Sequence, residues 1–564
     1  MDTNGSNSRW WHGATLYQVY VRSWFDTNGD GYGDLPGVIA KLDYLSWLGV
    51  DGIWLSPTMP SPDDDWGYDV SGYFGVHPEL GTLVDLDRLV AEAAERNMEV
   101  LLDLVPNHTS TAHPWFADAI TGRDSAHRSY YVWADPAPGG GPPTNWLDAT
   151  GHSAWAFDEA SGQYYLHNFL ASQADLNWWE PAVHQEFREI LRFWFDRGIA
   201  GFRIDVAQGL YKDAELRDDP PSATPDRLHS RFGLEQVYSA NRPESHRVFR
   251  DWRKIAESYS PPRLLLGETW VSELDRMAAF HGQGDELQLT FNFPFIFADF
   301  TAPALSRIVA ETLAALPAGE CPVWTASNHD ISRFPSRWGG GDERKARLAL
   351  LILAMLPGTF VLYYGDEIAM TDVDVPPDLR RDRMTSSGLG SGGRDRARTP
   401  MQWDASPSAG FTAEGVTPWL PYGDNATRNV AAQRGDPASV LRLCRDLIAL
   451  RRAEFGRAGS AAAGSAGAGS AGAGSAAAGS GGAGSGGAER GGRIARYREL
   501  PGPPGLWAYR VDGLLVAGNF TGEPIALDAP AGPVVASSAA GVLDRGVLAP
   551  WAGVVTRPGP SGPC

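Results

Sequence analysis

The chain is 564 residues long, of which 43% are hydrophobic and 21% charged, and this composition is typical of a folded globular protein. A disordered or fibrous chain is therefore excluded, and the length fits one large domain with additions or two to three domains. The formal net charge of -20 offers no basic surface to phosphates or anionic headgroups, so we expect no nucleic acid and no membrane among the partners.

The amino-terminal sequence MDTNGSNSRWWHG lacks the basic region and apolar run that form a secretory signal. We therefore predict a cytoplasmic location. The cysteines Cys321, Cys444 and Cys564 are odd in number and far apart, which predicts free thiols rather than disulfides or a thiolate metal site. The oligomeric state stays open between a monomer and a homo-oligomer.

Short apolar runs rich in β-branched and aromatic residues alternate along the chain with segments of helical period. Eight such runs span residues 15–21, 52–56, 100–105, 201–206, 263–269, 287–293, 323–327 and 360–364. This alternation predicts an α/β protein in which eight parallel strands, with helices between them, close into a (β/α)8 TIM barrel.

Three segments depart from this alternation. The gap between the third and fourth runs is longer than one crossover helix needs, which predicts a subdomain inserted after the third strand. A Gly/Ala/Ser-rich tract predicts a flexible linker, and alternating segments such as LWAYRV beyond it predict a C-terminal antiparallel β-sandwich. The predicted units are a barrel in two parts (1–112 and 175–455), inserted subdomain B (113–174), the linker (456–492) and the C-terminal β-sandwich domain (493–564).

The segment DTNGDGYGD, residues 26–34, follows the first predicted strand and carries oxygen-bearing side chains at alternating positions, as calcium loops do. This pattern predicts a site for a hard cation, most simply Ca²⁺. The twelfth position is Gly37 rather than Glu, which excludes an EF-hand. The alternative is an acidic polar turn without an ion.

The fourth predicted strand brings an arginine and an acid to one face. Residues two apart in a strand share a face, so Arg203 and Asp205 both point into the barrel and form an ion pair. The guanidinium is expected to favour the carboxylate form of Asp205, which a nucleophile requires. A structural salt bridge explains this strand equally well.

The fifth predicted strand ends on an acid. In LLLGETW, Glu268 follows an apolar run and precedes Trp270, at the end of the strand where barrel enzymes place their chemistry. An apolar environment would raise the pKa of Glu268 and leave it protonated to donate to a leaving oxygen. Taken alone, a glutamate at a strand end is also a common helix cap.

Further acids and histidines follow other strands. His329 and Asp330 end the seventh strand and His108 follows the third, whereas Asp103 lies within the third strand and is interpreted as structural. Each histidine alone would be read as a packing residue. Because several strand ends deliver such side chains to one rim, packing does not account for them and a catalytic centre is predicted.

The motifs DLVPNH, GFRIDVA, LLLGETW, SNHD, QADLN and RTPMQWD together resemble the α-amylase superfamily, in its α-glucosidase and oligo-1,6-glucosidase branch. The resemblance runs from Trp10 to about Arg452. It implies that Asp205 forms a covalent glucosyl-enzyme and that Glu268 is the general acid/base, with the two carboxyls about 5 Å apart. It assigns sugar hydroxyls to Asp330 and hydrogen-bond donors to His108, His329 and Arg203.

The same resemblance implies the end of the substrate that is bound. Asp69 and Arg398 would grip the terminal glucose and Tyr68 would stack on it, which predicts exo action at the non-reducing end. Of the two readings of the segment 26–34, the resemblance favours the cation site. The implied Ca²⁺ ligands are Asp26, Asn28, Asp30, Tyr32 and Asp34.

The predicted activity is a retaining α-glucosidase that releases glucose from short oligosaccharides such as maltose. Val206, directly after the nucleophile, is typical of α-1,6 hydrolysers, whereas the stretches around Asp205, Glu268 and Arg398 favour α-1,4 linkages. Two alternatives are an oligo-1,6-glucosidase and a transglucosylase or isomerase such as a trehalose-forming enzyme. A non-enzymatic transporter heavy chain is disfavoured because all three acids are present.

Overall fold

The computed structural model describes residues 9–223, 230–384, 393–456, 495–527 and 532–557. At its centre, eight parallel strands form a nearly closed barrel in the order β13-β12-β9-β3-β2-β1-β15-β14. All eight runs predicted as strands contain one, which confirms the (β/α)8 barrel. The strands are β1 (Thr15–Val19), β2 (Gly52–Leu55), β3 (Glu99–Leu104), β9 (Gly201–Ile204), β12 (Leu264–Gly267), β13 (Leu289–Thr290), β14 (Val323–Trp324) and β15 (Thr359–Tyr363).

Helices cover the outside of the barrel because each presents one apolar face to it. In α5 (Pro181–Asp196), Val183, Phe187 and Leu191 are buried, and Pro181 begins the helix where its missing N–H is not needed. The helix α3 (Leu83–Glu95) begins with a capping box between Thr82 and Asp85. The other barrel helices are α1 (Leu35–Ala40), α2 (Leu42–Leu48), α6 (Ser245–Glu257), α7 (Leu274–Ala279), α8 (Phe293–Ile296), α9 (Ala302–Ala315), α10 (Phe334–Arg337), α11 (Glu343–Met355), α12 (Val430–Gly435) and α13 (Val440–Phe455).

None of the helices in the described part of the chain is both long enough and apolar enough to cross a bilayer. The register of the barrel strands determines which side chains meet at the rim. Arg203 of β9 pairs with Asp103 of β3 on one side and with Leu266 of β12 on the other. Ile204 pairs with Gly267, so the residues that follow these two, Asp205 and Glu268, leave the barrel side by side.

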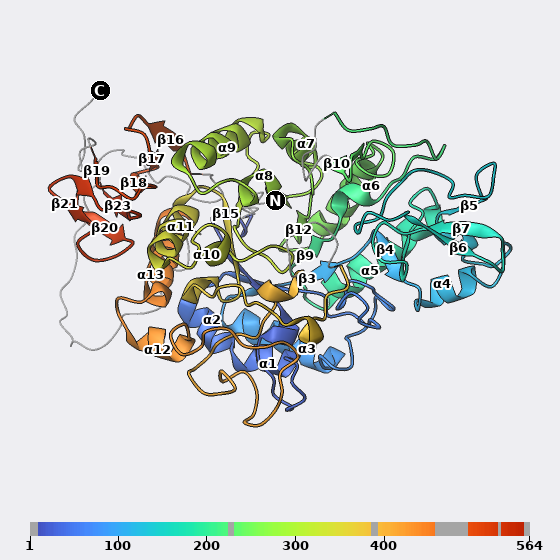
Figure 1. Cartoon of the computed structure of the whole chain (residues 1–564), viewed down its shortest axis with the longest axis horizontal. Coiled ribbons are helices and arrows are strands. Elements are labelled where there is room, and N and C mark those ends of the chain that lie inside the picture. Colours follow the sequence, from blue (N-terminus) through green and yellow to red (C-terminus); the bar gives the residue numbers. More distant parts are fainter. Residues whose placement is uncertain (1–8, 224–229, 385–392, 457–494, 528–531, 558–564) are drawn as a thin grey trace, which may run out of the picture.

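A subdomain is inserted between β3 and α5, as predicted, and extends from the barrel at the right of Figure 1. The chain leaves and re-enters through one antiparallel ladder, in which β4 (His108–Ser110) pairs with β8 (Gln173–Asp175). Beyond the ladder lie α4 (Pro114–Ala119) and a sheet of β5 (Trp133–Ala134), β7 (Gln163–Leu166) and β6 (Trp155–Asp158). His108 is therefore held at the junction of the barrel and the insertion.

The C-terminal region forms two antiparallel sheets, at the left of Figure 1, as the predicted sandwich requires. Successive side chains of strand β17 face opposite sides of its sheet. Ala508 packs with the smaller C-terminal sheet, whereas Trp507 and Tyr509 pack with the barrel helices. The predicted linker lies outside the described residues, apart from Gly456. The strands are β16 (Tyr497–Leu500), β17 (Leu506–Val511), β18 (Leu514–Asn519), β19 (Ile525–Ala526), β20 (Val534–Ser537), β21 (Leu543–Asp544), β22 (Val547–Leu548) and β23 (Gly553–Thr556).

Candidate active site

One buried guanidinium joins the acids that end strands β9 and β12. Nη1 of Arg203 lies 2.6 Å from Oδ1 of Asp205, and Nη2 lies 3.0 Å from Oε2 of Glu268. Arg203 is 1% exposed, Asp205 5% and Glu268 6%, so the two carboxyls retain only a small opening to solvent. The structure therefore brings the two predicted acids together on one cation, as the shared register of their strands requires.

The residue after Asp205 holds the Glu268 carboxyl from the other side. The backbone N–H of Val206 donates to Oε2 of Glu268 at 2.9 Å. Val206 adopts φ 46° and ψ 44°, a left-handed conformation that is costly for a β-branched residue, on the order of 1–3 kcal/mol. This conformation turns the amide toward Glu268 and fixes that carboxyl beside Asp205.

The pKa of Asp205 depends on burial and on several charged neighbours. Burial raises it well above its usual range, and Arg203 lowers it only in part, because Glu268 and Asp103 repel further negative charge. Burial likewise raises the pKa of Asp103 to about 6, against the opposing effect of Arg203. Arg203 therefore favours the carboxylate form of Asp205, as predicted, but this effect does not by itself determine the pKa because three carboxyls share one guanidinium.

Asp103 lies beneath the two acids and ties Arg203 to the aromatic wall of the site. Its carboxylate accepts from Nη1 of Arg203 at 2.8 Å and from the Tyr68 hydroxyl at 3.0 Å. The Tyr68 ring is buried and stacks on the ring of His329, with 5.1 Å between centroids and 2° between planes. One face of Tyr68 is thus covered by His329, and the stacking of this ring on a sugar stays a prediction.

His329 is held in a single protonation state by its neighbours. Its Nδ1 lies 2.8 Å from the Gln18 amide nitrogen, which only donates, so Nε2 carries the proton and lies 3.0 Å from Oδ2 of Asp330. Burial lowers the pKa of His329 to about 4. His329 is accordingly a neutral donor at working pH.

Two further guanidiniums bind Asp330. Nη2 of Arg398 donates to Oδ1 of Asp330 at 2.9 Å, and Nη1 of Arg394 approaches the same oxygen at 3.2 Å. Burial acts to raise the pKa of Asp330, but His329 and the two arginines outweigh it and hold the pKa well below its usual range. Asp330 therefore stays ionised.

Asp69 and Arg398, the predicted pair, have different hydrogen-bond partners from each other, and an unpredicted pair, Asp65 and Arg394, is in contact. The carboxylate of Asp69 is fully buried and accepts from Ser61 Oγ and from the amides of Asp64 and Asp65, so it holds its own loop. Asp65 instead binds Nη2 of Arg394 at 2.5 Å. Arg394, four residues before Arg398, thereby links Asp65 to Asp330.

His108 occupies the wall formed by the inserted subdomain. Its Nε2 lies 3.0 Å from the Tyr68 carbonyl, and its Nδ1 lies 3.1 Å from Nδ2 of Asn107. Gln173, from β8, contacts Nε2 of His108 at 3.2 Å and the Asp65 carboxylate at 3.1 Å. The two sides of the site are therefore connected through Gln173, which the sequence did not single out.

The family follows from this geometry together with a sequence match. Residues 18–458 match the model of the alpha-amylase catalytic domain. The chain belongs to the alpha-amylase family. As a member of this glycoside hydrolase family it is an enzyme that acts on oligosaccharides, and the neighbouring Asp205 and Glu268 lie at the rim where barrel enzymes carry their active sites.

Curated relatives within the alpha-amylase family include a probable alpha-glucosidase of Rhizobium meliloti, which is 40% identical over 79% of this chain and 83% of that protein. An oligo-1,6-glucosidase of Parageobacillus thermoglucosidasius is 37% identical over 78% of this chain and 84% of that protein. Among solved structures, an alpha-glucosyl transfer enzyme is 34% identical, with a TM-score of 0.85 and 97% and 99% coverage. The trehalulose synthase of Pseudomonas mesoacidophila MX-45 is 29% identical, with a TM-score of 0.83 and 98% and 99% coverage.

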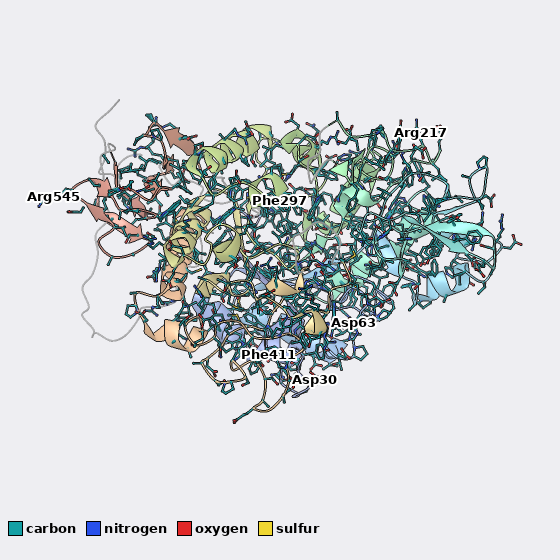
Figure 2. The ribbon with its side chains drawn as sticks, in the orientation of Figure 1. Asp30, Asp63, Arg217, Phe297, Phe411 and Arg545 are labelled. Atoms are coloured by element: carbon teal, nitrogen blue, oxygen red, sulfur yellow. The ribbon has the colours of Figure 1, made fainter. Side chains whose placement is uncertain are left out.

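The predicted cation loop of this alpha-amylase family member closes on itself through its own side chains. Asp26 accepts from the amides of Asn28 at 3.1 Å and Gly29 at 2.7 Å, and Asp30 accepts from the amide of Tyr32 at 2.8 Å. Asp34 caps α1 by accepting from the Gly37 amide at 2.6 Å. Asp30 is labelled toward the bottom of Figure 2. Carboxylate oxygens retain a second lone pair, so this all-oxygen set fits a hard cation in its chemistry.

A second group of possible ligands consists of Asp63, His77 and Glu79, of which Asp63 is labelled in Figure 2. The Arg22 guanidinium binds Asp63 at 2.7 Å and Glu79 at 3.0 Å. A metal cation there would meet a fixed positive charge. We therefore interpret this group as a salt-bridge network.

Proposed function

We propose that the chain is an exo-acting, retaining α-glucosidase that releases terminal α-linked glucose from short oligosaccharides such as maltose. The observation that carries this proposal is the pair Asp205 and Glu268, held on one guanidinium at the ends of neighbouring strands. Relatives named alpha-glucosidase and oligo-1,6-glucosidase support the substrate class.

In the first step, an Asp205 oxygen forms a bond to the anomeric carbon while the bond from that carbon to the glycosidic oxygen breaks. The proton of Glu268 moves to the departing oxygen. Arg203 contacts both carboxyls, so it stabilises the negative charge as it passes from Asp205 to Glu268.

In the second step, the ionised Glu268 removes a proton from water, whose oxygen bonds to the anomeric carbon as the bond to Asp205 breaks. Two inversions give net retention of the α-anomer. His329 donates and Asp330 accepts at the sugar hydroxyls, and their bonds strengthen as positive charge develops on the ring. The hydrogen bond from the Val206 amide to the Glu268 carboxylate keeps this base in place between the two steps.

The restriction to a terminal glucose is assigned to the Asp65–Arg394 pair rather than to Asp69 and Arg398. A carboxylate and a guanidinium in contact offer an acceptor and a donor to the outermost hydroxyls of one glucose. Arg398, which is fully buried, supports Asp330 from behind, and Asp69 shapes the loop that carries Asp65. The pair would end the pocket after one sugar ring.

The linkage is proposed to be α-1,4, with α-1,6 hydrolysis and glucosyl transfer as the competing activities. The likeness to a trehalulose synthase keeps transfer as a competitor. A time course on maltose, isomaltose, sucrose and trehalose tests the choice. Free glucose formed fastest from maltose is expected. Faster release of glucose from isomaltose would instead assign the enzyme to α-1,6 linkages. Formation of trehalose or longer saccharides without free glucose would show that the enzyme transfers glucose rather than hydrolysing the substrate.

We propose Ca²⁺ as a structural ion in the loop of Asp26, Asn28, Asp30, Tyr32 and Asp34. Binding only to the folded state would raise thermal stability, so a chelator should lower the melting temperature of the native protein by about 2–5 °C. Asp30→Ala should abolish this chelator effect, whereas Asp446→Ala, an exposed acid on α13, should keep it. If the chelator does not change the melting temperature of the native protein, the alternative of an acidic polar turn without an ion would be favoured.

A cytoplasmic location remains a proposal. Cys321 and Cys444 are both buried free thiols, which a reducing compartment would maintain. Fractionation of the producing cells, with activity on maltose as the marker, tests it. Activity recovered outside the cytoplasm would contradict it.

A further inference from the structure

A second cavity, of about 690 Å³, lies between the inserted subdomain and the barrel. This volume is within the range of small-molecule sites. None of the acids or histidines of the candidate active site lines it. Its walls come from Arg123, Asp124, Ser125, Arg128, Ser129, Tyr131, Val132, Trp133 and Gln163 of the subdomain and from Leu176, Asn177, Trp178, Trp179, Lys212, Asp213, Ala214 and Leu216 of the barrel.

The barrel wall of this cavity carries an exposed indole in a fixed position. The side chain of Trp179 is large and apolar, yet Trp179 is 43% exposed. Its Nε1 donates to the Lys212 carbonyl at 2.9 Å, and its edge packs on the Tyr211 ring at 4.8 Å and 89°. Because the indole is held by both contacts, it offers a flat apolar surface without losing side-chain entropy when a ligand covers it.

The subdomain wall is equally rigid and carries a second indole. The Arg128 guanidinium lies 3.3 Å from the centroid of the Trp133 ring and is fixed by a bond to Gln163 Oε1 at 2.7 Å. Asn177 joins the two walls, since its Nδ2 donates to the Ser129 carbonyl at 2.9 Å and its Oδ1 accepts from the Trp179 amide at 3.2 Å. The cavity is therefore a built feature of the junction between subdomain and barrel.

Lys212 separates this cavity from the catalytic centre. Its buried ammonium lies 2.6 Å from Oδ2 of Asp175 and 2.8 Å from Oδ1 of Asn107. Asn107 in turn contacts His108 at 3.1 Å. A ligand in the cavity would therefore lie on the other side of the Lys212 ion pair from the His108 wall, not in the glucose pocket.

Two of the three cations in the lining are already paired with acids, since Arg123 binds Asp135 at 3.0 Å and Lys212 binds Asp175 at 2.6 Å, so the lining does not call for an anion. Of the two acids in the lining, Asp213 binds Arg217, labelled in Figure 2, at 2.5 Å, and Asp124 leaves one further charge. A mixed lining of indoles, hydroxyls and amides instead suits a neutral polyhydroxyl ligand. The C–H bonds on one face of a pyranose carry partial positive charge and pack on the electron-rich face of an indole, while its hydroxyls both donate and accept.

We propose that this cavity is a second, non-catalytic binding site for an α-linked gluco-oligosaccharide, with Trp179 as its stacking platform. The choice of an α-glucan rests on the proposed function, because a second site on this enzyme would meet the same sugars as the first. Such a site would hold substrate on the enzyme without cleaving it.

Titration calorimetry of the full chain with maltotriose tests this, in an Asp205→Asn background that removes turnover. The expected result is a binding event that weakens at least tenfold when Trp179→Ala is added. Phe157→Ala removes another exposed aromatic side chain of the subdomain, 49% exposed and outside the cavity, and should change nothing. An isotherm that Trp179→Ala leaves unaltered would overturn the proposal.

A second variant guards against an effect of Trp179 on folding. Ala214→Met adds bulk to an exposed position in the lining without removing a contact, and it should abolish the same binding event. Retained binding in Ala214→Met would also contradict the proposal. Hydrolysis of maltose by the unmodified chain is measured separately, so a failure of the glucosidase assignment and a failure of the second site give different results.

Discussion

The rim of the barrel contains two buried guanidinium clusters that differ in the number of cations for each acid. Around Arg203, three carboxyls share one cation, and the pKa values of Asp103 and Asp205 are raised. Around Arg394 and Arg398, two cations serve Asp65, Asp330 and Asp382, neutral His329 also contacts Asp330, and the pKa of Asp330 lies well below the usual range. The ratio of cations to acids, rather than burial alone, separates them, since both clusters are buried.

This difference matches two kinds of work. The proposed acid/base and nucleophilic chemistry needs carboxyls whose charge changes during the reaction, and the cluster with fewer cations for each acid is the one in which pKa values are raised. The proposed recognition of sugar hydroxyls needs an acceptor of constant charge, and the cations around Asp330 keep that carboxylate ionised. Changing the acids or cations of each cluster is therefore the direct way to test the comparison.

The largest effect is expected for Asp205→Asn. The amide cannot form the glucosyl-enzyme, so kcat on maltose should fall about 10⁴-fold or more. Asp446→Asn, which changes an exposed acid on α13, should leave kcat within twofold. Retained turnover in Asp205→Asn would remove the nucleophile from the Arg203 cluster and with it the assignment of that cluster to chemistry.

The second largest effect is expected for Arg203→Lys, which should lower kcat/KM on maltose about 10²–10³-fold. A lysine keeps the charge but lacks the planar fork that contacts Asp103, Asp205 and Glu268 at once. Steady-state kinetics on maltose measures the effect, and thermal melting verifies the fold. A loss below threefold in a folded variant would mean that charge alone, not geometry, organises the acids.

Asp103 offers a test through stability rather than rate. Its pKa rises from 3.8 to about 6 on folding, so the folded state binds more protons between these values and loses stability as the pH rises through them. The penalty above pH 6 is about 3 kcal/mol. Urea unfolding should show Asp103→Asn gaining roughly this amount relative to the native chain between pH 4 and pH 7.

The opposite sign is expected for Asp330, whose pKa is lowered on folding. It contributes stability that is present above its unfolded pKa and is lost as the pH falls below it. Asp330→Asn should therefore differ from the native chain more at pH 7 than at acidic pH. Parallel pH profiles for Asp103→Asn and Asp330→Asn would contradict the contrast between the clusters.

The smallest effect is expected for Arg394→Lys. One ammonium cannot bridge Asp65, Asp330 and Asp382, so the terminal glucose should bind less tightly and KM on maltose should rise about tenfold while kcat changes less. Arg383→Lys alters a neighbouring, exposed arginine that pairs with Asp64 and serves as the control. A change confined to kcat would assign Arg394 to chemistry instead.

The sequence was sufficient for the barrel and for most of the rim. Apolar runs such as 201–206 and 263–269 end on Asp205 and Glu268, and a parallel barrel collects strand ends on one face, so these residues were predictable. The contacts of the loop residues were not predictable from the sequence. Asp65 and Asp69 belong to one loop and Arg394 and Arg398 to one short turn, and no periodicity distinguishes them; only the folded loop turns Asp69 inward and Asp65 toward Arg394.

The raised pKa values of Asp103 and Asp205 were also not predictable from the sequence. Arg203 next to Asp205 in one strand indicated an ordinary ion pair, because Asp103 and Glu268 come from other strands and their shared use of the guanidinium is a property of register. The pattern that could have indicated it is the placement of Asp103 within β3, opposite Arg203.

The central claim is that Asp205 and Glu268 act as nucleophile and acid/base in a double displacement. Proton NMR of maltose hydrolysis, recorded before mutarotation equilibrates the product, tests it most directly. The account predicts that the glucose released from the non-reducing end appears first as the α-anomer. First appearance of that glucose as the β-anomer would contradict it.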